Sequence, residues 1–199
     1  MRGAVAVDAH MRRRATAPAT LWKRLEARLN MLRLHASMLS EEVQIRATNH
    51  VPTVDPIDTS PEAAARIVRM QRGMPIGPVR DLTGWMEAAG CLIVAESFGT
   101  PRVDGMSQWI DGVPILLINA DAPTDRKRLT LAHELGHLVM HSTEITEDVE
   151  EQANAFAAEF LMPADVIRPQ LRNLRIDALP DLKRQWGVSM AALIERAFH

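Results

Sequence analysis

Apolar positions in residues 21–47 recur every three or four residues, which is the spacing of one face of an α-helix. This segment predicts an amphipathic helix, or two in succession, whose leucine stripe can pair with a second chain. The three prolines of residues 49–61 favour an extended linker over a further helix. The pattern therefore predicts an N-terminal helical arm with its linker over residues 1–55, and a globular domain over residues 56–199.

The pattern changes from helical to extended and back within the predicted domain. Ser60 is typical of a helix start, and Gly73 and Gly90 are typical of the ends of two short helices. Runs rich in Val, Ile and Leu then predict strands, before helical spacing returns. The expected strands are 91–97, 105–110 and 113–120, and the expected long helices are 121–141 and 143–163. The order predicts an α+β fold, in which a small, mostly antiparallel sheet packs against two long helices.

The last expected strand, Pro114–Asn119, directly precedes the first of these long helices. It is a plausible sheet edge, to which an extended peptide can add through backbone hydrogen bonds, and it is equally compatible with a core strand.

The first long helix carries the candidate chemistry, within the sequence TLAHELGHLVMH at residues 130–141. Side chains four residues apart lie on one helix face, so His133 and His137 can point their imidazoles at the same ion. Glu134 lies one position further round, beside that ion. This HExxH pattern is typical of zinc sites in which the two histidines bind the metal. The glutamate then acts as the general base on zinc-bound water.

A hydrolytic zinc site needs a third protein ligand and keeps a fourth position for water. His141 lies eight residues after the first histidine, about 12 Å along a helix axis, so it is not expected to reach the same ion. A carboxylate from the next helix fits better, and Glu150 is favoured over Glu147 and Glu151. Asn154 lies one turn after Glu150 and is expected to accept a hydrogen bond from a ligand histidine.

The segment LTLAHELGHLVMH, followed by EEQANAFAAEFLMP, resembles the ImmA/IrrE family of zinc metallopeptidases. The likeness extends over about residues 55–199. It implies a zincin-like fold in which zinc is held by the two HExxH histidines and by a glutamate of the second segment. By position these ligands are His133, His137 and Glu150, with Glu134 catalytic.

The resemblance also implies a class of substrate, because the best-described activity of the family is cleavage of a partner transcriptional repressor. Many members carry an N-terminal helix-turn-helix domain before a helical connector. Residues 1–50 resemble the connector alone, so a shortened member without the DNA-binding unit is expected.

Composition narrows the remaining classes of function. No apolar run approaches the ~20 residues of a transmembrane helix, so no membrane association is expected. Cys91 is the one cysteine, which excludes an internal disulfide and favours the reducing cytoplasm. Residues 1–50 hold nine basic against four acidic side chains, whereas the rest of the chain holds 14 against 21. Because Trp22 is the one aromatic residue of this basic segment, direct nucleic-acid binding is not expected.

Together these features predict a zinc-dependent endopeptidase that acts on a repressor or another regulatory protein. Tyrosine, which some zinc peptidases use to stabilise the oxyanion, is absent from the chain. His141, Arg126 or a backbone N–H is therefore a candidate for that role or for contact with the substrate. The alternative is a non-catalytic regulatory or toxin–antitoxin interaction module that retains a structural zinc site.

Overall fold

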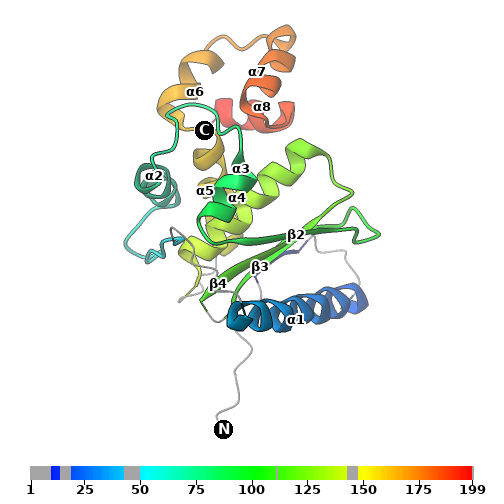
Figure 1. Ribbon diagram of the computed structural model, residues 1–199. Helices are drawn as coiled ribbons and strands as arrows, with labels where there is room; N and C mark the ends of the chain where they lie inside the picture. Colours follow the sequence, from blue (N-terminus) through cyan, green and yellow to red (C-terminus); the bar gives the residue numbers. More distant parts are fainter. Residues whose placement is uncertain (1–9, 14–18, 43–49, 111, 143–147, 199) are drawn as a thin grey trace.

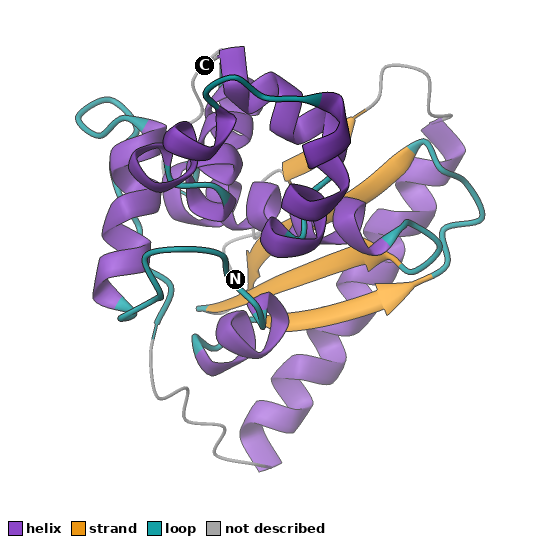
Figure 2. Ribbon diagram, turned by 90° about the horizontal axis from the view of Figure 1, so that it is seen from above, coloured by secondary structure: helices purple, strands orange, loops and turns teal. Residues whose placement is uncertain are grey.

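The computed structural model describes residues 10–13, 19–42, 50–110, 112–142 and 148–198 of the 199-residue chain. One small sheet separates two layers of helices, so the α+β prediction is confirmed (Figures 1 and 2). A single helix, α1 (Ala19–Glu42), covers one face. The other side carries α2 (Pro61–Gln71), α3 (Leu82–Ala88), α4 (Thr124–Met140), α5 (Val149–Leu161), α6 (Ala164–Leu171), α7 (Leu179–Trp186) and α8 (Met190–Phe198).

The sheet has the strand order β1-β3-β4-β2. Its strands are β1 (His10–Arg13), β2 (Leu92–Glu96), β3 (Val103–Ile110) and β4 (Val113–Asn119). β3 pairs antiparallel with β1 and with β4, whereas β2 runs parallel to β4. The sheet is therefore mixed, and its parallel pair was not predicted. The Asp111-Gly112 dipeptide is a local sequence signal for the β3–β4 hairpin, but no local feature of the sequence specifies that β2 pairs with β4.

The position of β4 corrects the prediction that this strand offers an open edge. In the register, Leu116 lies opposite Ser107 of β3 on one side and Ile93 of β2 on the other. Both edges of β4 are thus occupied within the sheet, and its apolar run is that of a central strand buried on both faces.

Side chains of β4 alternate between two cores, as the two-residue period of a strand requires. Leu116 and Ile118 belong to the larger core, which lies under α2 to α8. Ile115 and Leu117 belong to a smaller core under α1. Apolar side chains therefore cover both faces of the sheet.

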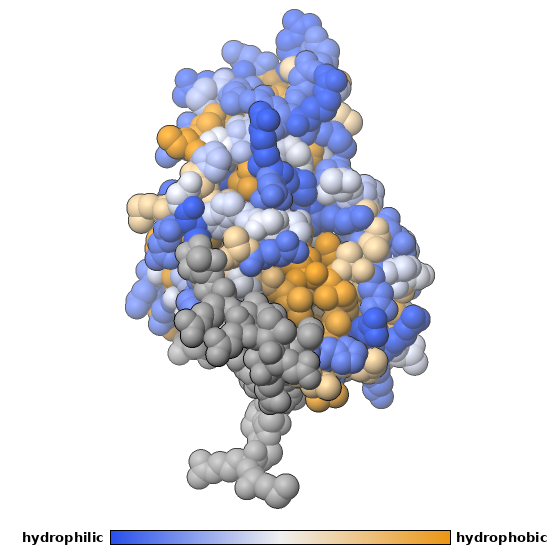
Figure 3. Space-filling model, viewed as in Figure 1, coloured by the Kyte–Doolittle hydropathy of each residue, from blue (hydrophilic) through white to orange (hydrophobic). Residues whose placement is uncertain are grey.

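Residues 21–42 of the predicted amphipathic segment lie in one helix, and part of its leucine stripe packs on the sheet. Residues 43–47 of that segment lie outside the described residues. Leu25 and Leu29 of α1 are 5% and 2% exposed and lie in the smaller core. These two leucines are therefore not available to a second chain. Among the large apolar side chains of α1 that the structure describes, Met31, Leu34 and Met38 remain exposed. Figure 3 shows an apolar area over β2 and the adjoining side of α1.

Helix ends follow the signals read from the sequence. The Ser60 hydroxyl accepts a hydrogen bond from the N–H of Ala63, at 3.3 Å, and so caps α2. Gly90 follows α3 with a φ of 88°, a left-handed conformation that glycine adopts without strain. Gly187 makes the turn between α7 and α8 with a φ of 65°. None of the described helices combines the length and the hydrophobicity that a membrane span requires.

Candidate metal site

The HExxH residues lie in the part of α4 that is enclosed on all sides. Every residue from Thr130 to Met140 is buried. Alternate residues of β3 meet successive turns of this helix: Ser107 contacts Glu134, and the Trp109 indole N–H donates to the carbonyl of Leu138 at 2.9 Å. These two contacts fix the position of α4 along β3.

Two glycines allow the close approach of the neighbouring elements to α4. A Cβ atom on Gly105 of β3 would lie 2.6 Å from Cγ2 of Thr130, which no real contact permits. A Cβ atom on Gly136 would lie 3.1 Å from the Phe156 ring of α5. Because glycine has no side chain, α4 packs directly on β3 at Gly105, and α5 packs against α4 at Gly136.

This packing brings His133, His137 and Glu150 together. The Nε2 atoms of the two histidines are 3.0 Å apart. Oε2 of Glu150 is 3.5 Å from Nε2 of His133, and Oε1 is 3.4 Å from Nε2 of His137. Both imidazoles are fully buried, whereas the Glu150 side chain is 48% exposed. The cluster therefore has a closed side on α4 and an open side at the start of α5.

The second ring nitrogen of His133 is fixed by α5. Its Nδ1 lies 2.9 Å from Oδ1 of Asn154. An amide oxygen only accepts hydrogen bonds, so Nδ1 carries the proton and Nε2 presents a lone pair to the cluster. Asn154 thus occupies the position expected from the sequence, one turn after Glu150.

The second ring nitrogen of His137 is fixed by a longer chain of contacts. Nε2 of His141 lies 2.8 Å from Oε1 of Gln152 and therefore donates to it. Nδ1 of the neutral His141 ring is then an acceptor, and it lies 3.0 Å from Nδ1 of His137. His137 consequently donates from Nδ1, and its Nε2 also presents a lone pair to the cluster.

Two lone pairs that face each other at 3.0 Å repel unless positive charge lies between them. Nitrogen and oxygen atoms 3.0–3.5 Å apart can share one zinc ion, which binds such ligands at about 2.0–2.1 Å. Two imidazoles and one carboxylate are also the ligand types that zinc prefers at catalytic sites. The donor set of His133, His137 and Glu150 therefore fits a divalent cation.

Without a metal, protons on the two histidine rings can take the place of the cation beside Glu150. Burial opposes ionisation of this carboxyl group, but hydrogen bonds and charge attraction from His133 and His137 in their protonated form outweigh it. The pKa of Glu150 is held well below its ordinary value. The group is thus a carboxylate at neutral pH, which is the form that binds a metal.

Glu134 is fully buried beside the cluster, and a serine of the sheet holds it. The hydroxyl of Ser107 donates to Oε2 of Glu134 at 2.7 Å. The same hydroxyl oxygen lies 3.2 Å from the backbone carbonyl oxygen of Glu134. The carboxylate is therefore anchored from β3 and not from α4 alone.

Other residues considered from the sequence lie elsewhere. Arg126 pairs with Asp104, with Nε 2.6 Å from Oδ1, and does not join the cluster. His141 is buried, and both of its ring nitrogens are engaged as described above. Glu151 is exposed and outside the group of candidate ligands, and Glu147 lies outside the described residues.

The sequence reasoning missed Ser107 and Gln152. Gln152 had a weak signal, because it lies two residues after Glu150 in the helix expected to carry the third ligand. Ser107 had none, because it comes from a strand 27 residues away from Glu134.

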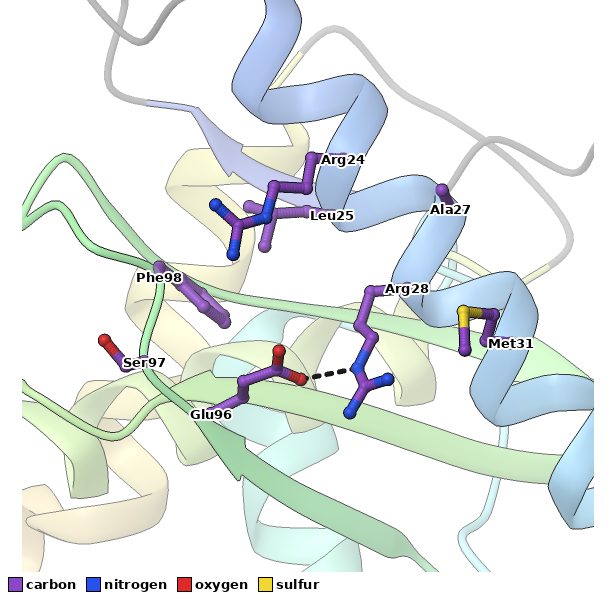
Figure 4. A pocket seen from close by; sticks show the side chains of 8 residues that line it. All are labelled: Arg24, Leu25, Ala27, Arg28, Met31, Glu96, Ser97 and Phe98. Atoms are coloured by element: carbon purple, nitrogen blue, oxygen red, sulfur yellow. Dashed lines mark hydrogen bonds and ion pairs between the residues drawn. The ribbon is translucent and has the colours of Figure 1, made fainter.

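A separate pocket of about 250 Å³ lies between α1 and the end of β2 (Figure 4). Arg28 and Glu96 face each other across it, with Nε 2.6 Å from Oε2. Leu25 and Phe98 form part of its apolar wall. None of its lining residues belongs to the metal cluster, so this pocket is distinct from the candidate site.

Fold and site together define an α+β domain with a candidate His–His–Glu metal site across two helices. A model of the IrrE N-terminal-like domain matches residues 86–198, which is more than half of the chain. The chain therefore belongs to the IrrE N-terminal-like domain family and contains an IrrE-family metalloprotease domain. The matched region includes all three candidate ligands and Glu134.

Known proteins that are similar to this chain include a curated metalloprotease and a protein of known structure. The radiation response metalloprotease IrrE of Deinococcus radiodurans is 27% identical over 168 residues, which cover 72% of this chain and 49% of that protein. This chain therefore spans about half the length of the curated relative. A Mycobacterium tuberculosis transcriptional regulator of known structure is 18% identical, with a TM-score of 0.50 over 68% of this chain and 46% of that one. This second likeness is one of fold.

Proposed function

We propose that this chain is a zinc-dependent endopeptidase that cleaves a regulatory protein. The observation that carries the proposal is the convergence of two imidazole lone pairs and a carboxylate beside the buried Glu134. Zinc held by His133, His137 and Glu150 would polarise a peptide carbonyl and lower the pKa of water towards ~7.

Glu134 performs the proton transfers in this proposal. Its carboxylate accepts a proton from the attacking water and delivers it to the leaving amine. The hydrogen bond from Ser107 keeps Oε2 in place and so limits the orientations of the base. Asn154 and the His141–Gln152 pair hold the two ligand imidazoles with their Nε2 atoms towards the metal.

One observation supports a substrate with a regulatory role: the similar Deinococcus protein is described as a radiation response metalloprotease. We further propose the cytoplasm as the place of action, because the one cysteine of the chain, Cys91, is buried and forms no disulfide.

Substitutions at two positions of α4, about one helical turn apart, test the proposal. Purified protein is expected to hold one zinc per chain by metal analysis, and His137→Ala is expected to lose it. Glu134→Gln is expected to keep zinc but to lose at least about 100-fold in the cleavage rate of a candidate repressor. Unchanged cleavage by Glu134→Gln contradicts the role of this residue. A zinc-loaded wild type that binds a repressor without cutting it supports the interaction module instead.

A further inference from the structure

The outer edge of β3 lies next to the candidate base, and the chain itself occupies that edge. Ser107 of β3, which holds Glu134, lies opposite His10 of β1 in the antiparallel register. Met106 likewise lies opposite Met11. Neighbouring strands are about 4.8 Å apart, so the backbone at His10 is one strand spacing from the residue that anchors Glu134.

β1 is a weak occupant of this edge. It has four residues, its register is irregular between Met11 and Arg13, and among the described strands it has a neighbour on one side only. A short edge strand of this kind adds few backbone hydrogen bonds, which a competing strand of equal length can replace.

We propose that the outer edge of β3 is a docking edge for an extended peptide segment of a partner protein, and that β1 occupies it as an internal competitor. The partner segment pairs antiparallel with Val103–Ser107 after β1 has left. Pairing with a strand edge uses backbone hydrogen bonds. A partner segment that binds there must therefore be extended and have no proline at the paired positions. The partner is a substrate only if the proposed peptidase function holds, whereas the docking edge does not depend on it.

Displacement of β1 can be measured with a peptide that copies it. The probe is the fluorescein-labelled peptide DAHMRRRA, which reproduces residues 8–15, and binding is followed by fluorescence anisotropy. The peptide DAPPRRRA keeps the aspartate and the three arginines but has proline at both positions that pair with Ser107 and Met106, so it controls for non-specific attraction of arginines. All measurements use full-length protein with Glu134→Gln, so that the probe is not consumed.

Proline in β1 is expected to open the edge. Hydrogen-bonded positions alternate along an antiparallel pair, so one of His10→Pro and Met11→Pro removes a ladder bond. That variant is expected to bind DAHMRRRA at least about tenfold more tightly than the parent, because the state in which β1 has left the β3 edge is populated more often. Met11→Val, which keeps the strand, is expected to bind like the parent. Equal affinities of the parent, His10→Pro, Met11→Pro and Met11→Val for DAHMRRRA overturn the proposal. Binding of DAPPRRRA as tight as that of DAHMRRRA also overturns it.

A reversible tether tests the same edge without introducing proline. Met11→Cys with Met106→Cys places cysteines at opposite positions, where Cα atoms lie about 4.5–5.5 Å apart and suit a disulfide. Cys91 does not interfere, because burial raises the pKa of its thiol to about 12. The oxidised protein is expected to bind no DAHMRRRA, and reduction is expected to restore binding. Equal binding in both states, or failure of the disulfide to form, overturns the proposal.

The outcomes separate this inference from the proposed function. Probe binding requires neither zinc nor Glu134, so a chain without peptidase activity can still show the competition by β1. If the protein is a zinc peptidase but changes in β1 do not alter probe binding, the proposed function stands and the proposal that β1 is a competitor is wrong.

Discussion

The two faces of the sheet bury different kinds of side chain. Under α1 the sheet buries a cluster of apolar side chains, namely Leu25, Leu29, Phe98, Val103, Met106, Ile110, Ile115 and Leu117. Against α4 the sheet covers polar side chains as well, namely Ser107, Thr130, His133, Glu134, His137 and His141. The same strands therefore serve an apolar contact on one side and a chemical site on the other.

The difference shows what each face requires. An apolar core gains stability with the area it removes from water, and that gain has no preferred direction. A buried polar group costs free energy unless a partner meets it at the right distance and angle. Substitutions under α1 should therefore change mainly the stability of the fold, whereas substitutions among the polar side chains on the α4 side should change mainly the geometry of the metal site.

The largest expected effect tests the α1 face. Leu29 is 2% exposed, so Leu29→Ala leaves a cavity and is expected to lower the free energy of unfolding by about 2–5 kcal/mol. Denaturant titration measures this loss, and metal analysis is expected to find unchanged zinc content in the folded protein. If zinc is lost in proportion to stability, the two faces do not act independently.

An intermediate effect is expected where β3 touches α4. Gly105→Ala forces the strand and helix apart, because the new Cβ would meet Cγ2 of Thr130 at 2.6 Å. Overpacking of this kind is expected to cost about 1–3 kcal/mol of unfolding free energy, and zinc should also bind more weakly. Gly77→Ala is the matched control, since its Cβ would meet nothing within 4 Å. Similar unfolding curves and zinc affinities for both variants would show that α4 does not depend on this contact.

The smallest expected effect concerns the metal site alone. Gln152→Ala removes the acceptor that fixes the ring of His141, and with it the orientation of His137. Zinc affinity, measured by competition with a chelator, is expected to fall about tenfold with little change in the free energy of unfolding. Gln152→Glu keeps an acceptor oxygen and is expected to restore most of the affinity. A purely structural role for Gln152 would instead lower stability and leave zinc affinity unchanged.

Local signals were sufficient for many elements of the fold. Ser60 and Gly90 mark helix ends, because a cap or a left-handed residue acts within a few positions of the chain. Helical spacing likewise placed His133 and His137 on one face, since positions four apart coincide after one turn. Glu150 and Asn154 could be proposed for the same reason, once the second helix was recognised.

Pairings between distant segments had no such signal. The parallel neighbour of β2, the interior position of β4 and the strand β1 on the outer edge of β3 depend on which segments meet after folding. A run of apolar residues reads the same in an edge strand and in a central one. The prediction of an open β4 edge was wrong for this reason.

The sequence by itself determined the ligand types, their helical spacing and the ends of the helices, because these properties depend on neighbouring residues. Only the tertiary structure decided that Ser107 anchors Glu134, that Gln152 acts through His141, and that β1 covers the edge beside them. Each of these contacts joins residues from different elements. Their distances are set by how closely α4 packs on β3 and α5, and Gly105 and Gly136 make that approach possible.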